Sequence, residues 1–204
     1  MIKTIIFDLG NVIINVDNAK LFKELAAKSS KTASYTEKWF ENSSCRKGFG
    51  NGKLTARQFY DKTAQELNLK INFNEFSKIW CDIFTLNEDV EKLIRDLKGK
   101  YRLLLLSNTD ILHFDYIKNK YKIIDIFDDY VLSYKVGYSK PNPLIFLSAL
   151  KKAKALPFNC AYIDDIPEFV YVARLMGIRA FQYKNFGKLA NDLKRVKVYQ
   201  KLYK

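Results

Sequence analysis

The feature that most constrains the fold is a short apolar run, rich in β-branched and other strand-forming residues, that ends abruptly in polar residues and recurs along the chain. Three such runs stop at acidic or hydroxyl side chains; they cover residues 2–7, 103–106 and 160–163. Runs of this kind are typical of buried strands in a parallel sheet. Two further strands are expected over residues 130–132 and 178–181.

Between these runs, apolar residues recur at spacings of three and four, as in amphipathic helices. Helices are expected over residues 90–97, 112–118, 143–152 and 167–176. Strands that alternate with helices favour an α/β fold, here a Rossmann-like, doubly wound parallel sheet with helices on both faces. A sheet of this type binds its ligand beyond the carboxyl ends of its strands.

Residues 17–87 break the alternation, because several helical patterns follow one another there. Helices are expected over residues 19–28, 35–40, 55–67 and 73–84, and the segment from Gly48 to Gly52 is expected to be a flexible loop, since its glycines disfavour a helix. We therefore predict a small helical subdomain, residues 17–87, inserted after the first strand into a core domain of residues 1–16 and 88–204.

The aromatic side chains of this insertion suit either the core of a helical bundle or the lining of a ligand pocket, and we favour the core. They are Phe22, Trp39, Phe40, Phe59, Tyr60, Phe73, Phe76, Trp80 and Phe84.

Charge is the most unusual aspect of the composition. The 204 residues include 35 basic and 22 acidic side chains, a formal net charge of +13, while 48% hydrophobic residues suffice for a substantial core. The lysines are dispersed, with the densest run between Lys194 and Lys204, and there is neither zinc-finger spacing nor an RNA-binding signature. We interpret the charge as a solvated surface that attracts anionic small molecules, without a specific nucleic-acid partner.

Cysteine usage and the N-terminus favour a cytoplasmic protein. Cys45, Cys81 and Cys160 are widely spaced and form no C-x-x-C pair, which predicts reduced thiols. Asp8 interrupts the apolar N-terminal segment, so it lacks the continuous stretch of a signal peptide. No segment reaches the ~20 apolar residues of a membrane span, so no membrane partner is expected. The oligomeric state is left open.

Polar residues that follow the strand ends are expected to meet at one edge of the sheet, where a lysine on a loop can join them. These residues are Asp8, Ser107, Asn108, Lys140, Asp164 and Asp165. Carboxylates gathered at one rim repel one another unless a cation lies between them. Because Mg²⁺ prefers oxygen ligands and phosphate, the pattern indicates a Mg²⁺ site for a small phosphorylated substrate.

These residues also resemble, in order and spacing, the four motifs of the haloacid dehalogenase-like (HAD) superfamily of hydrolases. The motifs read here Asp8-Leu9-Gly10-Asn11-Val12, Leu106-Ser107-Asn108-Thr109, Lys140-Pro141-Asn142-Pro143 and Ile163-Asp164-Asp165. The resemblance covers nearly the whole chain, and the helical insertion lies where such proteins often carry a cap. The motif sequences FDLGNV, SNT and KPNP are most similar to those of the α-D-glucose-1-phosphate phosphatase-like branch.

The resemblance implies a phosphatase in which Asp8 attacks phosphorus and forms an aspartyl-phosphate. It implies that Mg²⁺ is held by Asp8, by the carbonyl of Gly10 and by Asp165, with Asp164 as a second ligand or as a support for the metal site.

Two further roles follow from the same resemblance. Ser107 and the backbone N–H of Asn108 would hydrogen-bond the transferring phosphoryl group, and Lys140 would stabilise the charge on Asp8 and on the phosphate. His113 is interpreted as a structural residue of a helix near the second motif.

The chain departs from the family pattern at two places. Most phosphatases of the superfamily have a second Asp two residues after the nucleophile, and Gly10 stands there. Gly10 cannot donate a proton, so we expect weak activity on alkyl phosphates and a preference for acidic leaving groups such as sugar 1-phosphates. In the fourth motif Phe169 replaces a polar residue, which leaves neighbouring Glu168 as a candidate to act through water.

Two other functions stay open at this stage. One is a catalytically weak binding or regulatory protein that kept the fold, as Gly10 and Phe169 suggest. The other is a 2-haloacid dehalogenase, which uses the same Asp8 nucleophile on carbon without a metal.

Overall fold

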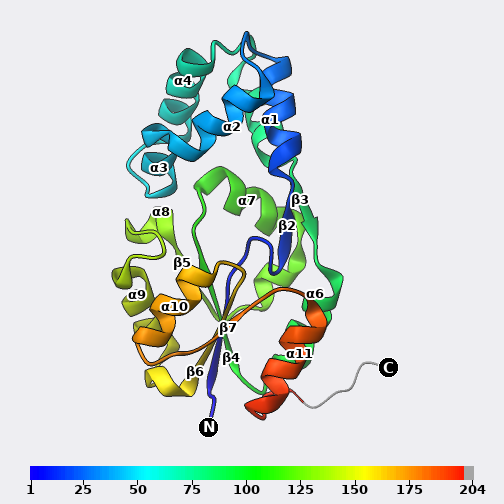
Figure 1. Ribbon diagram of the computed structural model, residues 1–204, viewed down its shortest axis with the longest axis vertical. Helices are drawn as coiled ribbons and strands as arrows, with labels where there is room; N and C mark the ends of the chain where they lie inside the picture. Colours follow the sequence, from blue (N-terminus) through cyan, green and yellow to red (C-terminus); the bar gives the residue numbers. More distant parts are fainter. Residues whose placement is uncertain (200–204) are drawn as a thin grey trace.

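Five parallel strands form the central sheet of the protein in the computed structural model, which describes residues 1–199 (Figure 1). Their order is β5-β4-β1-β6-β7, and each neighbouring pair is parallel. The strands are β1 (Thr4–Phe7), β4 (Arg102–Ser107), β5 (Asp129–Leu132), β6 (Cys160–Asp164) and β7 (Arg179–Gln182). The sheet predicted from the five apolar runs is therefore confirmed.

Helices cover both faces of this sheet because successive strand residues point to opposite sides. On β1, Ile5 and Phe7 pack in one buried cluster, whereas Ile6 belongs to another. The first cluster contains residues of α6 (Glu88–Leu97), α7 (Ile111–Lys120) and α11 (Phe186–Arg195); the second contains residues of α9 (Pro143–Ala153) and α10 (Pro167–Leu175). Figure 1 shows α9 and α10 on the side of the sheet away from α6 and α11.

Short elements complete the core. They are the 3-10 turns η1 (Lys122–Ile126) and η2 (Pro157–Asn159) and the one-turn helix α8 (Ser133–Val136). Helix α11 was not predicted, although Leu189 and Leu193 are fully buried at helical spacing. The helix was not predicted because the lysines of this segment drew attention away from the apolar residues at helical spacing.

Five helices lie between a pair of short antiparallel strands, β2 (Ile14–Val16) and β3 (Phe84–Leu86). They are α1 (Asn18–Ala27), α2 (Ala33–Asn42), α3 (Ser44–Gly50), α4 (Ala56–Leu67) and α5 (Phe73–Cys81). In Figure 1, α1 to α4 gather at the end of the molecule farthest from the N-terminus. The helix expected over 73–84 is wrong at its C-terminus, because Phe84 pairs with Val16 across the two strands.

The glycine-rich segment expected to be a loop is largely helical, so that prediction was wrong. Ser43 caps α3 by accepting a hydrogen bond from the N–H of Arg46. Phe49 is buried and stacks on Phe59 with 4.3 Å between ring centroids. Burial of an aromatic ring is worth ~2–3 kcal/mol, and it offsets a helix cost of about 1 kcal/mol for each of the two glycines of α3, Gly48 and Gly50.

The aromatic residues of the insertion divide between core and cavity. Phe59, Phe76 and Trp80 are buried and pack on one another, as predicted for a bundle core. Trp80 also lines the cavity described below, together with Phe40 and Phe84. All three cysteines are buried free thiols. Within residues 1–199, no helix has the length and apolarity needed to cross a membrane.

Candidate active site

The order of the strands brings three of the predicted motifs together. Strand β1 lies between β4 and β6, so its carboxyl end is flanked by the ends of both neighbours. Asp8 follows β1, Ser107 ends β4 and Asp164 ends β6. The Asp8 backbone N–H donates to the Ile163 carbonyl at 2.9 Å and thereby fixes the start of the loop after β1.

Lys140 is the centre of the site. Its Nζ lies 2.7 Å from Asp8 Oδ1 and 2.7 Å from Asp164 Oδ2. It also donates to the Leu106 carbonyl at 3.2 Å. Only 3% of this lysine is exposed, so its charge depends on these partners rather than on water. The third motif, which the sequence placed on a nearby loop, therefore reaches both acidic motifs directly.

Asp164 is fully engaged by the protein itself. Besides Lys140, its Oδ2 accepts a hydrogen bond from the Tyr162 hydroxyl, and its Oδ1 accepts from the Ile166 N–H at 2.8 Å. The whole residue is buried. Sequence reasoning missed Tyr162, although a polar-tipped residue two positions before an Asp in a strand points to the same face and can reach it.

Asp165 differs from its neighbour, because it is only partly buried and contacts the loop after β1. Asn11 Nδ2 donates to Asp165 Oδ2 at 3.2 Å, while Asn11 Oδ1 accepts from the Val16 N–H at 3.2 Å. Asn11 adopts a left-handed conformation with φ of 52°, which asparagine tolerates better than most residues. One ligand oxygen from each of Asp8, Asp164 and Asp165 lies within 4.8 Å of the others.

The electrostatics of this cluster favour a bound cation. The pKa of Asp8 is raised to about 7, because burial raises it strongly and Asp164 adds to that effect, while Lys140 partly offsets both. Burial also acts to lower the pKa of Lys140, but Asp8 and Asp164 outweigh it and the net shift is upward. Three carboxylates face one ammonium, which leaves an excess of two negative charges when all are ionised. A divalent ion with a preference for oxygen ligands, such as Mg²⁺, fits that charge and donor set.

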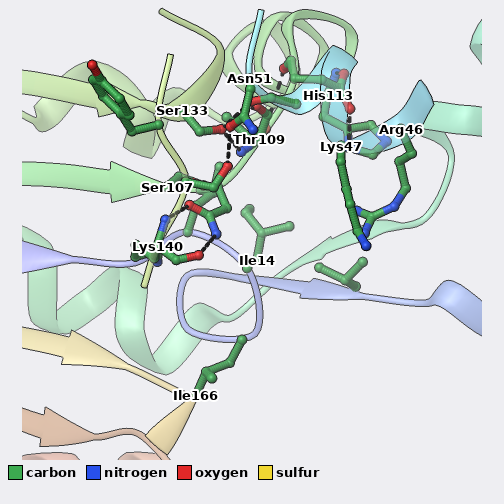
Figure 2. A pocket seen from close by; sticks show the side chains of 18 of the residues that line it. Ile14, Arg46, Lys47, Asn51, Ser107, Thr109, His113, Ser133, Lys140 and Ile166 are labelled. Atoms are coloured by element: carbon green, nitrogen blue, oxygen red, sulfur yellow. Dashed lines mark hydrogen bonds and ion pairs between the residues drawn. The ribbon is translucent and has the colours of Figure 1, made fainter. Parts of the chain in front are cut away.

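Asn108 and Ser107 border the site on the side of β4. Asn108 Nδ2 donates to the Lys140 carbonyl at 2.9 Å, and its Oδ1 accepts from the Lys140 N–H at 2.7 Å. The Asn108 side chain therefore holds the lysine loop, a contact the sequence did not predict. Ser107 is 2% exposed and lies close to Lys140 in Figure 2.

A cavity of about 1070 Å³ lies over these strand ends. Its lining includes Ser107 and Lys140 from the sheet side, and Arg46 and Lys47 from the inserted helices (Figure 2). The cavity therefore lies between the sheet and the insertion, a position typical of small-molecule sites.

Hydrogen bonds close one side of the cavity by linking the insertion to the core. Ser133 Oγ donates to the Gly50 carbonyl at 2.6 Å, and Ser139 Oγ donates to Asn51 Oδ1 at 2.5 Å. The glycine-rich segment at the C-terminal end of α3 thus makes the docking contact, with Gly52 against the backbone of Tyr134.

His113 joins the core to the insertion on another side. Its Nε2 lies 2.8 Å from the Trp80 carbonyl, its Nδ1 lies 3.2 Å from Asp110 Oδ2, and its ring stacks on Trp80. These contacts agree with the structural role expected for this residue.

The fourth motif has no substitute ligand at Glu168, which is exposed and lies outside the group of three carboxylates among the described residues. Phe169 instead packs near Lys140, with 5.2 Å between Nζ and the ring centroid.

Comparison with known proteins places this geometry in a family. A model of haloacid dehalogenase-like hydrolases matches residues 2–176. A D-ribitol-5-phosphate phosphatase from Bacteroides thetaiotaomicron is 27% identical over 202 residues, which are 95% of this chain and 97% of that protein. An HAD family enzyme from the same organism, solved with magnesium and inorganic phosphate, has a TM-score of 0.82 and 26% identity over 90% of this chain and 95% of its own. A predicted HAD-like hydrolase from Porphyromonas gingivalis has a TM-score of 0.85 at 22% identity, covers 98% of this chain and 100% of its own, and shows the same fold.

Proposed function

The chain belongs to the haloacid dehalogenase-like hydrolase family, and we propose that it is a Mg²⁺-dependent phosphatase of small phosphorylated metabolites. Two comparisons support this proposal: a similar protein is named a D-ribitol-5-phosphate phosphatase, and a similar structure holds magnesium and inorganic phosphate. The observation that carries the proposal is that Lys140, which lines the cavity, contacts both Asp8 and Asp164.

Asp8 is the proposed nucleophile. One carboxylate oxygen attacks phosphorus, and the bond from phosphorus to the ester oxygen breaks. The leaving group departs as an alkoxide that takes its proton from water, since the Gly10 position offers none. Water then attacks phosphorus in the aspartyl-phosphate and releases inorganic phosphate, which restores Asp8. Lys140 holds Asp8 by its Oδ1 and supplies positive charge beside the incoming phosphoryl group. Ser107 and the backbone N–H of Asn108 are proposed to bind the phosphoryl oxygens.

We assign the two acidic residues of the fourth motif to different roles. Asp164 uses both oxygens on Lys140, Tyr162 and Ile166, so we propose that it positions the lysine. Asp165 is partly open and would hold Mg²⁺ together with Asp8 and the carbonyl of Gly10. The ion, when bound, neutralises charge that would otherwise repel an anionic phosphate from an anionic nucleophile.

Gly10 narrows the range of efficient substrates. It cannot protonate the departing alkoxide, and such help is typically worth ~100- to 10,000-fold in rate. We therefore propose that the best substrates have acidic leaving groups, as sugar 1-phosphates do. D-ribitol 5-phosphate, in the name of the similar protein, is an ester of a primary alcohol and is the natural competing substrate to measure.

Residues 17–87 are proposed to act as a cap over a core domain of residues 1–16 and 88–204. The hydrogen bonds of Ser133 and Ser139 to this segment, and the cavity beneath it, support that division.

Hydrolysis of p-nitrophenyl phosphate, whose phenolic leaving group needs little protonation, tests the proposal. The native protein and Asp8→Asn are compared with Mg²⁺ and with EDTA, and Asp89→Asn, an exposed acidic residue of α6, serves as the matched control. We expect turnover that requires both Mg²⁺ and Asp8. Absence of turnover by the native protein would favour a binding protein, and metal-independent release of halide from 2-chloropropionate would favour a dehalogenase.

A further inference from the structure

The inserted helix α3 places two cations in the cavity wall, away from the strand ends. Arg46 and Lys47 both line the cavity, and Figure 2 shows them extending from α3 well apart from Ser107 and Lys140. The phosphatase chemistry proposed above uses neither of them. Their charge therefore needs a separate explanation.

Arg46 is held in place but its charge is not neutralised. Its Nε donates to the Phe40 carbonyl at 2.5 Å, and its guanidinium lies over the Phe40 ring, 4.2 Å from the centroid. Among residues 1–199, neither Arg46 nor Lys47 has a carboxylate partner within the 4.0 Å of a salt bridge. The rigid placement aims a fixed cation at the cavity.

Partial burial makes the missing counter-ion of Arg46 more costly. The Arg46 side chain is half-buried, and burial lowers its pKa while the more distant Asp110 opposes that shift. Asp110 is already engaged, because its Oδ2 accepts from Trp80 Nε1 at 3.1 Å and lies 3.2 Å from His113 Nδ1. A guanidinium removed from water without a counter-ion is costly, and a carboxylate or phosphate that accepts two parallel N–H bonds removes that cost.

We propose that Arg46, assisted by Lys47, forms a second anion-binding subsite, and that the preferred substrate carries a second negatively charged group besides its phosphate ester. This inference rests on the proposed phosphatase function, since it assumes that the ester phosphate binds beside Asp8. The substrate class is then a phosphorylated sugar acid or a bisphosphate. A planar guanidinium matches either anion, and the size of the cavity leaves room for a carbon chain between the two ends.

The test uses pairs of phosphate esters that differ only in a distal CH₂OH or carboxylate group. The pairs are glycerol 3-phosphate with 3-phosphoglycerate, ribitol 5-phosphate with 5-phosphoribonate, and glucitol 6-phosphate with 6-phosphogluconate. Glucitol 1,6-bisphosphate is added to distinguish a second phosphate from a carboxylate. We expect kcat/KM of the native enzyme to be at least tenfold higher for the doubly anionic member of at least one pair.

Variants of Arg46 and Lys47 test whether these two residues cause the preference for the doubly anionic substrate. Arg46→Gln is expected to reduce the ratio of acid to alditol to near one, and Lys47→Gln to reduce it partly. Arg57→Gln removes an exposed arginine of α4 that pairs with Asp61 and does not line the cavity, so it should leave the ratio unchanged. Equal or better use of the alditol in every pair, or an unchanged ratio in Arg46→Gln, would overturn the inference.

Binding measurements separate this inference from the proposed function. Dissociation constants of the same pairs are measured by calorimetry on Asp8→Asn, with and without Arg46→Gln. If p-nitrophenyl phosphate is hydrolysed and neither assay shows a preference for the second anion, only the subsite is wrong. If p-nitrophenyl phosphate is not hydrolysed but the acids bind tenfold more tightly through Arg46, the subsite stands and the phosphatase proposal fails.

Discussion

Replacement of Gly52 by alanine tests how the inserted helices dock on the core. Gly52 follows α3 with φ of +70°, and a Cβ built on it would lie 2.1 Å from the Tyr134 carbonyl oxygen, where real contacts do not fall below 3.0 Å. The segment must therefore move by roughly 1 Å. That movement strains the adjacent hydrogen bonds of Ser133 to Gly50 and of Ser139 to Asn51.

Gly99 provides the matched control, because it has φ of +82° and no atom within 4 Å of the added Cβ. Alanine in a left-handed conformation costs about 1 kcal/mol at either position. Each strained hydrogen bond adds about 1 kcal/mol for Gly52→Ala, so the totals are about 3 and about 1 kcal/mol. For a chain of this length, 1 kcal/mol corresponds to roughly 2–4 °C in Tm.

Calorimetry and steady-state kinetics measure the difference. We expect Gly52→Ala to lower Tm by ~6–12 °C and Gly99→Ala by ~2–4 °C. Since Asn51 lines the cavity, Gly52→Ala should also lower kcat/KM for p-nitrophenyl phosphate by about tenfold. Equal Tm losses in the two variants, with unchanged kinetics, would refute the inferred contact between the insertion and the core.

Four further predictions address the site and the surface. A Cβ on Gly10 meets only Val16 at 3.7 Å, so Gly10→Asp should fold and raise kcat on alkyl phosphates by ~100-fold or more; an unchanged rate would show that protonation of the leaving group is not limiting. Tyr162→Phe removes the hydroxyl donor to Asp164 and should lower the free energy of unfolding by about 2 kcal/mol in urea titrations, and no loss would contradict that contact. Burial raises the pKa of Cys81 to about 12, so the thiolate is scarce at pH 8 and the folded protein should react with Ellman's reagent far more slowly than protein in guanidinium. Finally, the net charge of +13 should steer phosphates to the protein, so kcat/KM should fall as NaCl rises from about 0.05 to 0.5 M, and a flat response would exclude steering.

The sheet was predictable because its signal is local. Each strand is a short apolar run that stops at a polar residue, and buried parallel strands require that pattern. Asp8, Ser107 and Asp164 were expected to share one edge for the same reason, and β1 lies between β4 and β6 in the structure. The catalytic and metal-binding roles of these residues stay predictions.

The features that were missed depend on contacts between distant segments. Helix α3 forms despite its glycines because Phe49 is buried against Phe59, which no local preference reveals. The end of α5 was misplaced because the pairing of Phe84 with Val16 joins segments far apart in the chain. The division of labour between Asp164 and Asp165 was left open for the same reason, since it depends on which carboxylate Tyr162 reaches.

The most direct test of the central claim is to capture the phosphoryl group on Asp8. The enzyme is mixed with p-nitrophenyl phosphate and Mg²⁺, quenched in acid within the first turnovers, digested, and examined by mass spectrometry. Because Gly10 provides no base for hydrolysis of the acyl phosphate, we predict accumulation of a phosphorylated peptide that contains residue 8 and is absent from Asp8→Asn. Rapid turnover with no phosphate on that peptide would contradict the account.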